Sequence, residues 1–142
     1  GELPFQSWKD SFHTGFNLEC LADYMKFTGD KSIEDGVNLG FDYYINNFFT
    51  EAGVPKYYNN AVYPVDIHSP AQLVVTVESL GRMNEYRGLV EKVINWTVSN
   101  MQDPKGFFYY QKKKYWTTKI PYMRWSQAWM AHSLVVYNKY ER

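Results

Sequence analysis

The chain has 142 residues, enough for one domain with a sizeable hydrophobic core. Its 15 lysines and arginines balance its 15 aspartates and glutamates, which excludes the basic footprint of a nucleic-acid-binding protein. A single cysteine excludes an internal disulfide framework and a multi-cysteine zinc site. Aromatic residues make up 19% of the chain, which suits either wide helix packing or a cleft where rings stack on sugars.

Neither a membrane span nor an export signal is apparent in the sequence. No apolar run approaches the roughly 20 residues that a membrane-spanning helix needs. Residues 1–5 also lack the basic and apolar regions of a signal peptide. We therefore predict a cytoplasmic protein without a membrane partner. The sequence begins without methionine, as a processed end or a piece of a longer chain would, and we expect the second.

The first two predicted helices form a hairpin after an irregular lead-in. Apolar residues cover more than one face of residues 13–27, which predicts a helix surrounded by other protein, with Cys20 buried in it. Gly29 suits the left-handed residue that follows this helix, and Asp30 suits the N-cap of the next one. The second helix, residues 31–49, is amphipathic and is predicted to lie on the outside.

Two further helices follow a long connection over residues 50–66. Residues 69–80 are apolar on most sides, which predicts a buried helix that Gly81 closes. Residues 85–101 show a single apolar face, and Asn84 is their predicted N-cap. These two helices therefore repeat the inner and outer arrangement of the first hairpin.

A second long connection, residues 102–121, precedes the fifth helix, which is predicted over residues 122–139. The connection contains two β-prone runs, residues 107–111 and 115–118, joined by three lysines at positions 112–114. We predict a small β-hairpin here, with the lysines in a solvated turn.

One short stretch recurs at the start of three of these helices. Residues 66–72, Asp-Ile-His-Ser-Pro-Ala-Gln, match residues 11–17 and 121–127, with His or Met in third place and an amide in seventh. Residues 46–53 and 99–106, at the ends of the outer helices, match as well. A fixed period with matching glycines marks stacked units of inner helix, turn, outer helix and long loop, here about two and a half of them. The sequence therefore predicts an all-α fold of five helices.

These helix starts resemble those of a known superfamily. Residues 12–19, 66–72 and 122–130 resemble the last segments of bacterial (α/α) toroid proteins from polysaccharide gene clusters. That superfamily of six-hairpin sugar-active proteins includes N-acylglucosamine 2-epimerase-like, unsaturated glucuronyl hydrolase-like and glucuronyl C5-epimerase-like members. The resemblance covers nearly all of this chain but less than half of a full toroid. It implies an incomplete α/α toroid, residues 1–142, from the C-terminal part of a longer chain.

Some proteins of this kind carry the label δ-aminolevulinic acid dehydratase, but the residues do not support that activity. That enzyme resembles a TIM barrel with a lysine pair that forms Schiff bases, often beside a cysteine zinc site. This sequence shows no alternating strand and helix pattern, and one cysteine cannot form that metal site.

The resemblance implies a sugar pocket at the inner-helix N-termini. His13 and His68 are the predicted catalytic residues, because imidazole exchanges protons near neutral pH and 2-epimerase-like relatives use proton abstraction and return. Both could instead be core histidines bonded to loop carbonyls. The predicted substrate-binding residues are Asn17, Glu19, Tyr58, Asp66, Gln72, Arg124, Trp125 and Gln127.

Several of these residues have competing interpretations. Glu19 places a carboxylate in a slot that is apolar in the other two repeats, and such positions are often functional. Arg124 replaces a cap residue and could clamp a sugar carboxylate or pair structurally with Glu19 or Asp66. Gln72 could face the pocket or merely complete a capping box over residues 69–72.

The predicted function is that of a carbohydrate-active protein, epimerase- or hydrolase-like, in polysaccharide or in uronic or amino sugar metabolism. A hydrolase needs an acidic residue as general acid, and Asp66 and Glu19 are the acids near the predicted rim, although neither lies in a diagnostic motif. No close His, Cys and Asp spacing supports a metal site, and no cofactor is expected. The alternative is a non-catalytic helical module that binds a partner or forms a homodimer through open helix faces.

Overall fold

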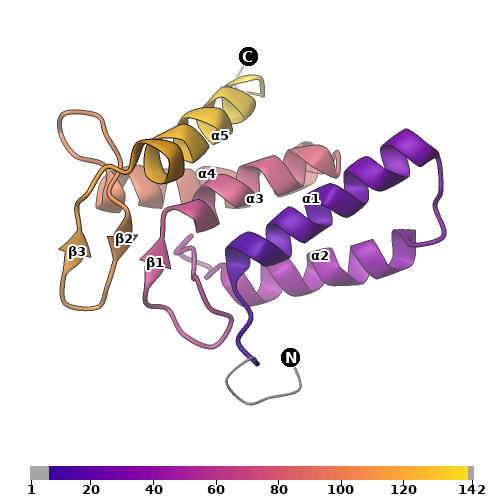
Figure 1. The fold of residues 1–142 in the computed structure, drawn as a ribbon, viewed down its shortest axis with the longest axis horizontal. Helices are drawn as coiled ribbons and strands as arrows, with labels where there is room; N and C mark the ends of the chain where they lie inside the picture. Colours follow the sequence, from indigo (N-terminus) through magenta and orange to yellow (C-terminus); the bar gives the residue numbers. More distant parts are fainter. Residues whose placement is uncertain (1–6, 141–142) are drawn as a thin grey trace.

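Three helices lie side by side in one layer of the computed structural model, which describes residues 7–140. They are α1 (Ser11–Thr28), α3 (His68–Ser79) and α5 (Ala128–Asn138), and α3 lies in the middle, in contact with both of the others (Figure 1). All three run in the same direction, so their N-terminal ends lie toward one end of the molecule. The candidate site lies at this end.

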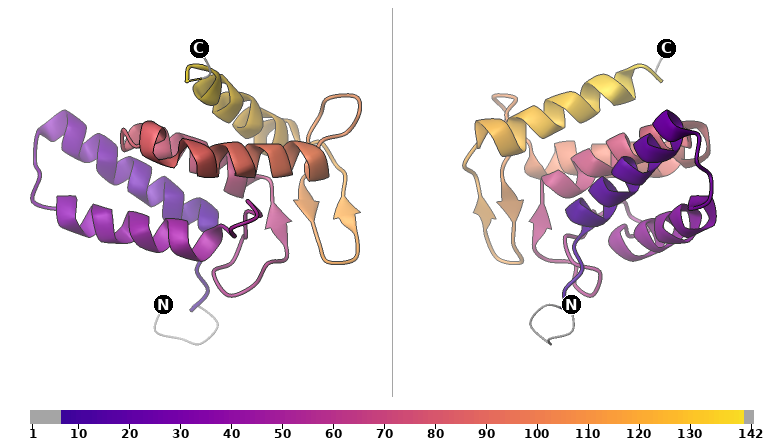
Figure 2. Two further views of the ribbon diagram at one scale, coloured as in Figure 1. Left: turned by 180° about the vertical axis from the view of Figure 1, so that it is seen from behind. Right: turned by 45° about the vertical axis from the view of Figure 1, so that its right-hand side comes forward.

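Two helices form a second layer behind the first. α2 (Glu34–Phe48) packs against α1, and α4 (Met83–Met101) packs against α3 (Figure 2). Large side chains fill the space between the layers, and Phe41, Tyr44 and Met101 are fully buried there. The predicted five helices and their order are confirmed, with bounds that differ by one to three residues at most ends.

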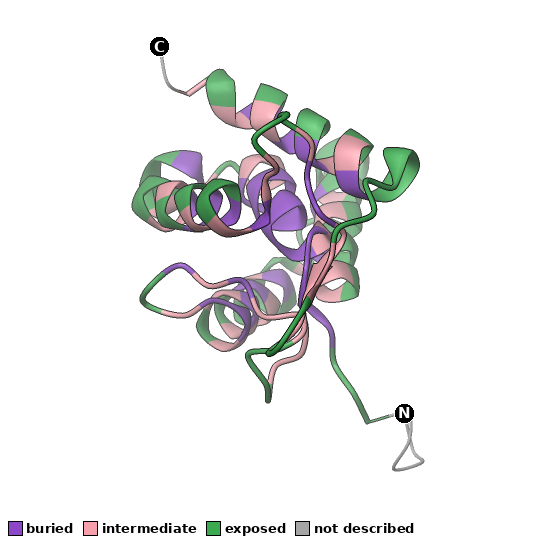
Figure 3. Ribbon diagram, turned by 90° about the vertical axis from the view of Figure 1, so that its left-hand side faces the viewer, coloured by how far each residue is buried: buried purple, intermediate pink, exposed green. Residues whose placement is uncertain are grey.

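The middle helix of the front layer is the most completely buried element. Every residue from 69 to 77 is buried, because α1 and α5 cover the two sides of α3 and α4 covers its back. In Figure 3 the buried segments gather between the helices, whereas the exposed ones lie on the outer surfaces. The prediction of a buried helix over residues 69–80 is therefore confirmed.

The prediction that the first helix is surrounded by protein is wrong. In α1 only Ser11, Gly15, Leu18 and Ala22 are buried, because this helix lies at the edge of the layer with α3 on one side and α2 behind it. Four large apolar side chains of α1 are exposed, namely Phe16, Leu21, Tyr24 and Phe27, and that of Phe27 is 80% exposed. Cys20, predicted to be a buried apolar residue, is also exposed.

Two of the predicted helix caps are confirmed and two are wrong. Gly29 and Gly81 have positive φ angles of 72° and 68°, as expected for residues that follow a helix. Asp30 does not cap α2, which begins four residues later; its carboxylate accepts a hydrogen bond from the Ser32 amide at 2.8 Å. Asn84 lies inside the first turn of α4, and that helix has no side-chain cap.

A small antiparallel sheet extends from the N-terminal end of the front layer. β1 (Val65–Asp66) pairs with β2 (Gln111–Lys112), and β2 pairs with β3 (Thr117–Thr118). The predicted hairpin is therefore confirmed with shorter strands. β1 was not predicted, because two residues are too few to show a strand pattern.

The fifth helix opens with a wider turn. Residues 123–127 form a π-helical turn, η2 (Met123–Gln127), in which the Gln127 amide donates a hydrogen bond to the Tyr122 carbonyl at 3.2 Å. α5 continues directly from it. The helix predicted over residues 122–139 is confirmed in extent, and its first turn is wider than an α-helical one.

Candidate functional site

The strongest candidate for chemistry is the pair Asp66 and His68, where β1 passes into α3. The Asp66 Oδ1 accepts a hydrogen bond from the His68 amide at 3.0 Å, and the His68 Nδ1 lies 2.7 Å from the same oxygen. An ionised carboxylate only accepts hydrogen bonds, so the Nδ1 carries the proton in this pair. One carboxylate oxygen thus accepts a hydrogen bond from the first amide of α3, and it also fixes the orientation and the tautomer of the imidazole.

The Asp66 carboxylate is buried and well supplied with donors. It is 3% exposed, and its second oxygen accepts a hydrogen bond from the Gln111 Nε2 at 3.2 Å. The pairing of β1 with β2 places Gln111 directly opposite Asp66. Within residues 7–140 the Nε2 of His68 has no protein partner, so this atom is available to accept or donate a proton at a ligand.

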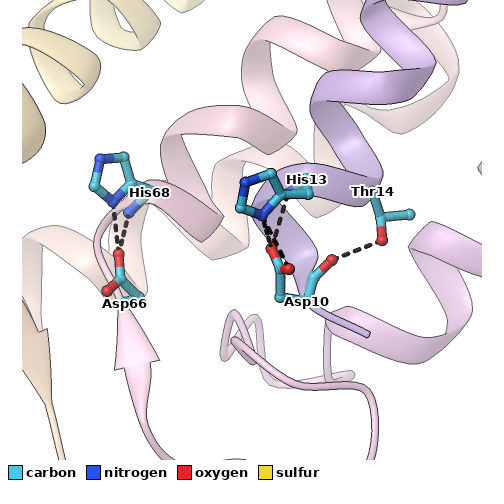
Figure 4. Close-up of polar contacts among 5 residues, drawn as sticks. All are labelled: Asp10, His13, Thr14, Asp66 and His68. Atoms are coloured by element: carbon cyan, nitrogen blue, oxygen red, sulfur yellow. Dashed lines mark hydrogen bonds and ion pairs between the residues drawn. The ribbon is translucent and has the colours of Figure 1, made fainter. Parts of the chain in front are cut away.

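A second pair of the same kind lies at the start of α1. Asp10 is the N-cap of α1, and its Oδ1 accepts a hydrogen bond from the His13 amide at 2.8 Å. The His13 Nδ1 lies 3.0 Å from each oxygen of that carboxylate. Figure 4 shows the two imidazoles on the same side of the helix starts, each next to its aspartate. Neither histidine is a core residue bonded to a loop carbonyl, so that alternative is wrong.

The two histidines differ in exposure. The His13 side chain is 63% exposed, whereas that of His68 is 14% exposed. Phe12 contacts both of them, with its ring centroid 5.2 Å from that of His13 and 5.0 Å from that of His68. His68 is therefore the more protected of the two and the one that lies in a cavity.

A pocket of about 320 Å³ opens beside His68 and is walled by aromatic rings. Rings from α1 and α5 meet in it, with the centroids of Phe12 and Trp129 5.5 Å apart. Its volume lies at the lower end of the range for small-molecule sites, roughly 300–1,000 Å³. The residues that line it are Phe12, Tyr57, Asp66, His68, Tyr110, Trp125 and Trp129.

Two tyrosines of this pocket are held in the neutral form. Burial raises the pKa of Tyr57, and the charges of Asp10 and Asp66 raise it further. Burial and the charge of Asp66 likewise raise the pKa of Tyr110. Both phenols therefore remain hydrogen-bond donors at neutral pH, which suits the hydroxyl and ring oxygens of a sugar.

We expect these tyrosines to ionise late in an alkaline titration of the folded protein. Tyr44, whose pKa is also raised by burial, should behave in the same way. A pKa that is raised in the fold stabilises the protein below the unfolded value of about 10, and this stabilisation is lost as the pH rises further. Tyrosinate absorbance followed against pH, in native buffer and in denaturant, should show a fraction that ionises only as the protein unfolds. Ionisation of all tyrosines together, with the helical circular dichroism intact, would contradict this.

The structure brings some predicted site residues together and separates others. Asp66, His68 and Trp125 line the pocket, and His13 lies beside it. Tyr58 lines a different cavity, next to the β2–β3 hairpin. Asn17 is exposed, and no side-chain hydrogen bond joins it to another part of the described chain. The residues missed as site residues are Asp10, Phe12, Tyr57, Tyr110, Gln111 and Trp129. Two of them belong to tyrosine pairs in the two long connections, at residues 57–58 and 109–110, and this repetition was the sequence signal for them.

The buried amide Gln72 contacts Glu19 rather than the pocket. Its Nε2 donates hydrogen bonds to the Glu19 Oε2 at 2.8 Å and to the Thr76 Oγ1 at 3.1 Å. The capping box considered as one alternative for residues 69–72 is therefore wrong, since this amide does not reach back to the helix start. Glu19 also lines a separate hollow of about 280 Å³, together with Ala128, Trp129 and His132.

Arg124 lies on the surface near the pocket. It shares a shallow hollow with Tyr122, Met123 and Trp125. In the part of the chain that the structure describes, it forms no ion pair with Glu19 or Asp66. The structural pairing considered for this arginine is therefore wrong, and its role as a clamp for a ligand carboxylate stays a prediction.

Gln127 joins the last loop to the start of α5. Its Nε2 donates a hydrogen bond to the Phe108 carbonyl at 2.7 Å, and its Oε1 accepts one from the Phe108 amide at 2.9 Å. This pair of hydrogen bonds fixes the chain just before Tyr110, and so helps to shape the pocket. The side chain predicted to bind substrate thus has a supporting role here.

Replacing Gln127 with alanine should destabilise the fold by about 1–3 kcal/mol, because it leaves both backbone groups of the buried Phe108 without a partner. Urea unfolding measures the change. Gln102→Ala is the control, since that amide forms a single exposed hydrogen bond with the Gly106 carbonyl and should change stability by less than about 0.5 kcal/mol. Equal effects of the two substitutions would contradict the supporting role of Gln127.

Comparisons with protein-family models, curated proteins and solved structures found no match. Among residues 7–140, no group of three His, Cys, Asp or Glu side chains is placed to hold a metal ion. The helices of this part of the chain are also too short or too polar to cross a membrane. The interpretation of the site therefore rests on its geometry.

Proposed function

We propose that the aromatic pocket binds a sugar and that His68 transfers a proton to and from it, as in an epimerase. The pair formed by His68 and the buried Asp66 carries this proposal. The Nδ1 of His68 lies 2.7 Å from the Asp66 carboxylate, which fixes the ring, and the Nε2 of His68 is free for a ligand. Aromatic rings on several sides suit the flat apolar faces of a sugar ring, and the neutral Tyr57 and Tyr110 phenols suit its hydroxyl groups.

The proposed chemistry is a proton transfer at a carbon next to a carbonyl group. The Nε2 of His68 takes the proton, and the electron pair of the broken C–H bond moves to the carbonyl oxygen. The imidazolium that forms is stabilised by the Asp66 carboxylate. Return of a proton to the same carbon completes the exchange, and delivery to the opposite face gives the epimer.

His13 is the proposed second proton donor. It has its own carboxylate in Asp10 and contacts the same Phe12 ring as His68. Its large exposure fits a group that exchanges protons with solvent. The histidines of two adjacent inner helices therefore supply two acid–base groups at one rim.

The proposal also includes the architecture of an incomplete α/α toroid. Parallel inner helices in one layer, outer helices behind them and long loops at the site end support it. The exposed outer edge of α1 is what the missing neighbour of a larger ring would cover. A structure of a longer natural chain, with further hairpins beside α1, would test this architecture.

Proton exchange in deuterated water tests the proposed chemistry. The protein would be incubated with uronic acids and with N-acyl amino sugars, and the proton signals next to the carbonyl carbon would be followed by NMR. Loss of one such signal, faster than in buffer alone, is the expected result. The absence of any enhanced exchange across both classes would contradict the proposal.

A non-catalytic helical module that associates with a second copy is the other candidate. The exposed apolar side chains on the edges of the front layer favour it, among them Phe27 on α1 and Val135 on α5, which are 80% and 64% exposed. Sedimentation over a range of protein concentrations tests this candidate. A strict monomer at the highest concentration would count against it.

A further inference from the structure

The β2–β3 hairpin tip forms one wall of a second cavity, which we call the lysine groove. Its tip residues are Lys113, Lys114, Tyr115 and Trp116, and the loop before β1 supplies Tyr58 and Tyr63 on the other side. The volume of the groove is about 630 Å³, roughly twice that of the aromatic pocket. A cavity of this size has room for more than the single sugar proposed for the pocket.

Each lysine of the tip lies against an aromatic ring. The Lys113 Nζ is 5.0 Å from the centroid of Trp116, and the Lys114 Nζ is 5.2 Å from the centroid of Tyr115. The Lys113 amide donates a hydrogen bond to the Trp116 carbonyl at 2.8 Å and closes the turn that carries all four residues. Positive charge and exposed ring surface are thus fixed side by side.

The charge of the groove has one sign. Its lining contains two lysines and no carboxylate, and within the described part of the chain neither lysine forms an ion pair. A neutral ligand would leave both ammonium groups without a counter-charge, whereas a ligand with carboxylate or sulfate groups supplies one. The exposed rings of Tyr115 and Trp116 favour a ligand that also has flat apolar faces.

The groove adjoins the aromatic pocket through consecutive residues. Tyr57 lines the pocket and Tyr58 the groove, and in the same way Tyr110 lines the pocket and Gln111 the groove. Gln111 also donates the hydrogen bond to Asp66. The ring centroids of Tyr57 and Tyr58 are 4.8 Å apart, so the pocket and the groove are neighbouring cavities that share a wall.

From this arrangement we infer that the lysine groove binds an acidic oligosaccharide, a chain of uronic acid or sulfated sugars whose terminal residue enters the pocket. Carboxylate or sulfate groups pair with Lys113 and Lys114, and sugar faces lie on Trp116 and Tyr115. The position of the terminal sugar rests on the proposed function, whereas the affinity of the groove for the chain is measurable without it.

Binding of a short oligogalacturonate to the full chain tests the inference, with a neutral malto-oligosaccharide of equal length as the comparison. We expect the acidic chain to bind at least about tenfold more tightly at low salt, with the difference shrinking as salt is added. Single-stranded polyuridylate is the third probe, because its phosphates and bases could also use lysines and rings. Tighter binding of polyuridylate, or equal binding of acidic and neutral sugars, overturns the inference.

The double substitution Lys113→Gln/Lys114→Gln should weaken binding of oligogalacturonate about tenfold and leave the neutral chain unaffected. Lys92→Gln/Lys105→Gln removes the same charge from exposed positions outside the groove, and should have little effect. Trp116→Ala should weaken binding of the acidic chain as well. Circular dichroism and thermal unfolding confirm that each variant is folded; an unchanged affinity in the folded lysine variant overturns the inference.

The same experiments separate this inference from the proposed function. If oligogalacturonate binds through the lysines but no sugar undergoes proton exchange, the proposed chemistry fails and the groove stands. If proton exchange occurs but the lysine variant binds the acidic chain normally, the groove fails and the proposed chemistry stands. His68→Gln should slow exchange by about 10²–10⁴-fold and leave the affinity for the acidic chain within about twofold, since that chain is held mainly by the groove.

Discussion

Replacing His68 with glutamine should slow the proton exchange of a bound sugar by about 10²–10⁴-fold, the usual contribution of a general acid–base group. Glutamine keeps a polar side chain of similar reach, but it cannot take up a proton near neutral pH. NMR in deuterated water measures the rate, on whichever uronic or amino sugar the wild-type protein exchanges.

Two control variants make this result specific. Asp66→Asn keeps an acceptor for the helix start but removes the charge that stabilises the imidazolium, so exchange should fall while the fold persists. In that variant the ¹⁵N signals of the imidazole should also shift away from the Nδ1–H tautomer. His132→Gln changes an exposed histidine outside the pocket and should leave exchange unaltered. An equal loss in the His132 and His68 variants would exclude a specific role for His68.

Gly15→Ala should destabilise the fold by about 2 kcal/mol, even though alanine is the better helix former. A Cβ at this position would lie 2.7 Å from the Gln72 Cγ, 2.8 Å from the Tyr44 hydroxyl and 2.9 Å from the Thr76 Oγ1. Overpacking of a buried contact costs about 1–3 kcal/mol, and because the added Cβ clashes with three atoms we expect a cost of about 3 kcal/mol here. The gain in helix propensity offsets only about 1 kcal/mol of that cost.

Thermal unfolding should show this change as a fall in Tm of roughly 6–10 °C. Gly36→Ala is the matched control, because it lies in α2 with nothing within 4 Å of the added Cβ. That substitution should stabilise the protein by about 0.5–1 kcal/mol. If Gly15→Ala were as stable as Gly36→Ala, α1 and α3 could not be as close as the structure places them.

The close contact at Gly15 also bears on the site. Phe12 and His13 precede it on the same helix, so a shift of α1 away from α3 would move both relative to His68. Gly15→Ala should therefore also reduce binding of a ligand in the aromatic pocket. The spacing of the two helices and the shape of the pocket depend on one residue without a side chain.

The helices could be predicted because their apolar patterns are long, and because glycines follow two of them, α1 and α3. The pattern of α3 is apolar on most sides, and this helix is the one that neighbours cover most fully. A similar pattern in α1 misled the prediction, because periodicity shows which residues are apolar but not which neighbours are present. Cys20 is exposed for the same reason.

The amides of the repeat show a second limit of sequence patterns. Gln72 and Gln127 occupy matching positions, but one bonds to Glu19 and the other to Phe108. The position was therefore predictable and its partner was not, since the partner comes from a distant part of the chain. Neither histidine–aspartate pair was predicted. Asp10 precedes His13 by three positions and lies outside the recurring stretch, whereas Asp66 precedes His68 by two and was predicted as a substrate-binding residue.

With that difference of one position, the two histidine–aspartate pairs differ in their resistance to local unfolding. The pair at His13 is built within the first turn of α1, so it lasts as long as that helix does. The pair at His68 depends also on Gln111, and hence on strands only two residues long. Short strands open locally well before a domain unfolds. On gentle warming, the pair of His68 with Asp66 should therefore break first, whereas the pair of His13 with Asp10 should persist until the helices melt.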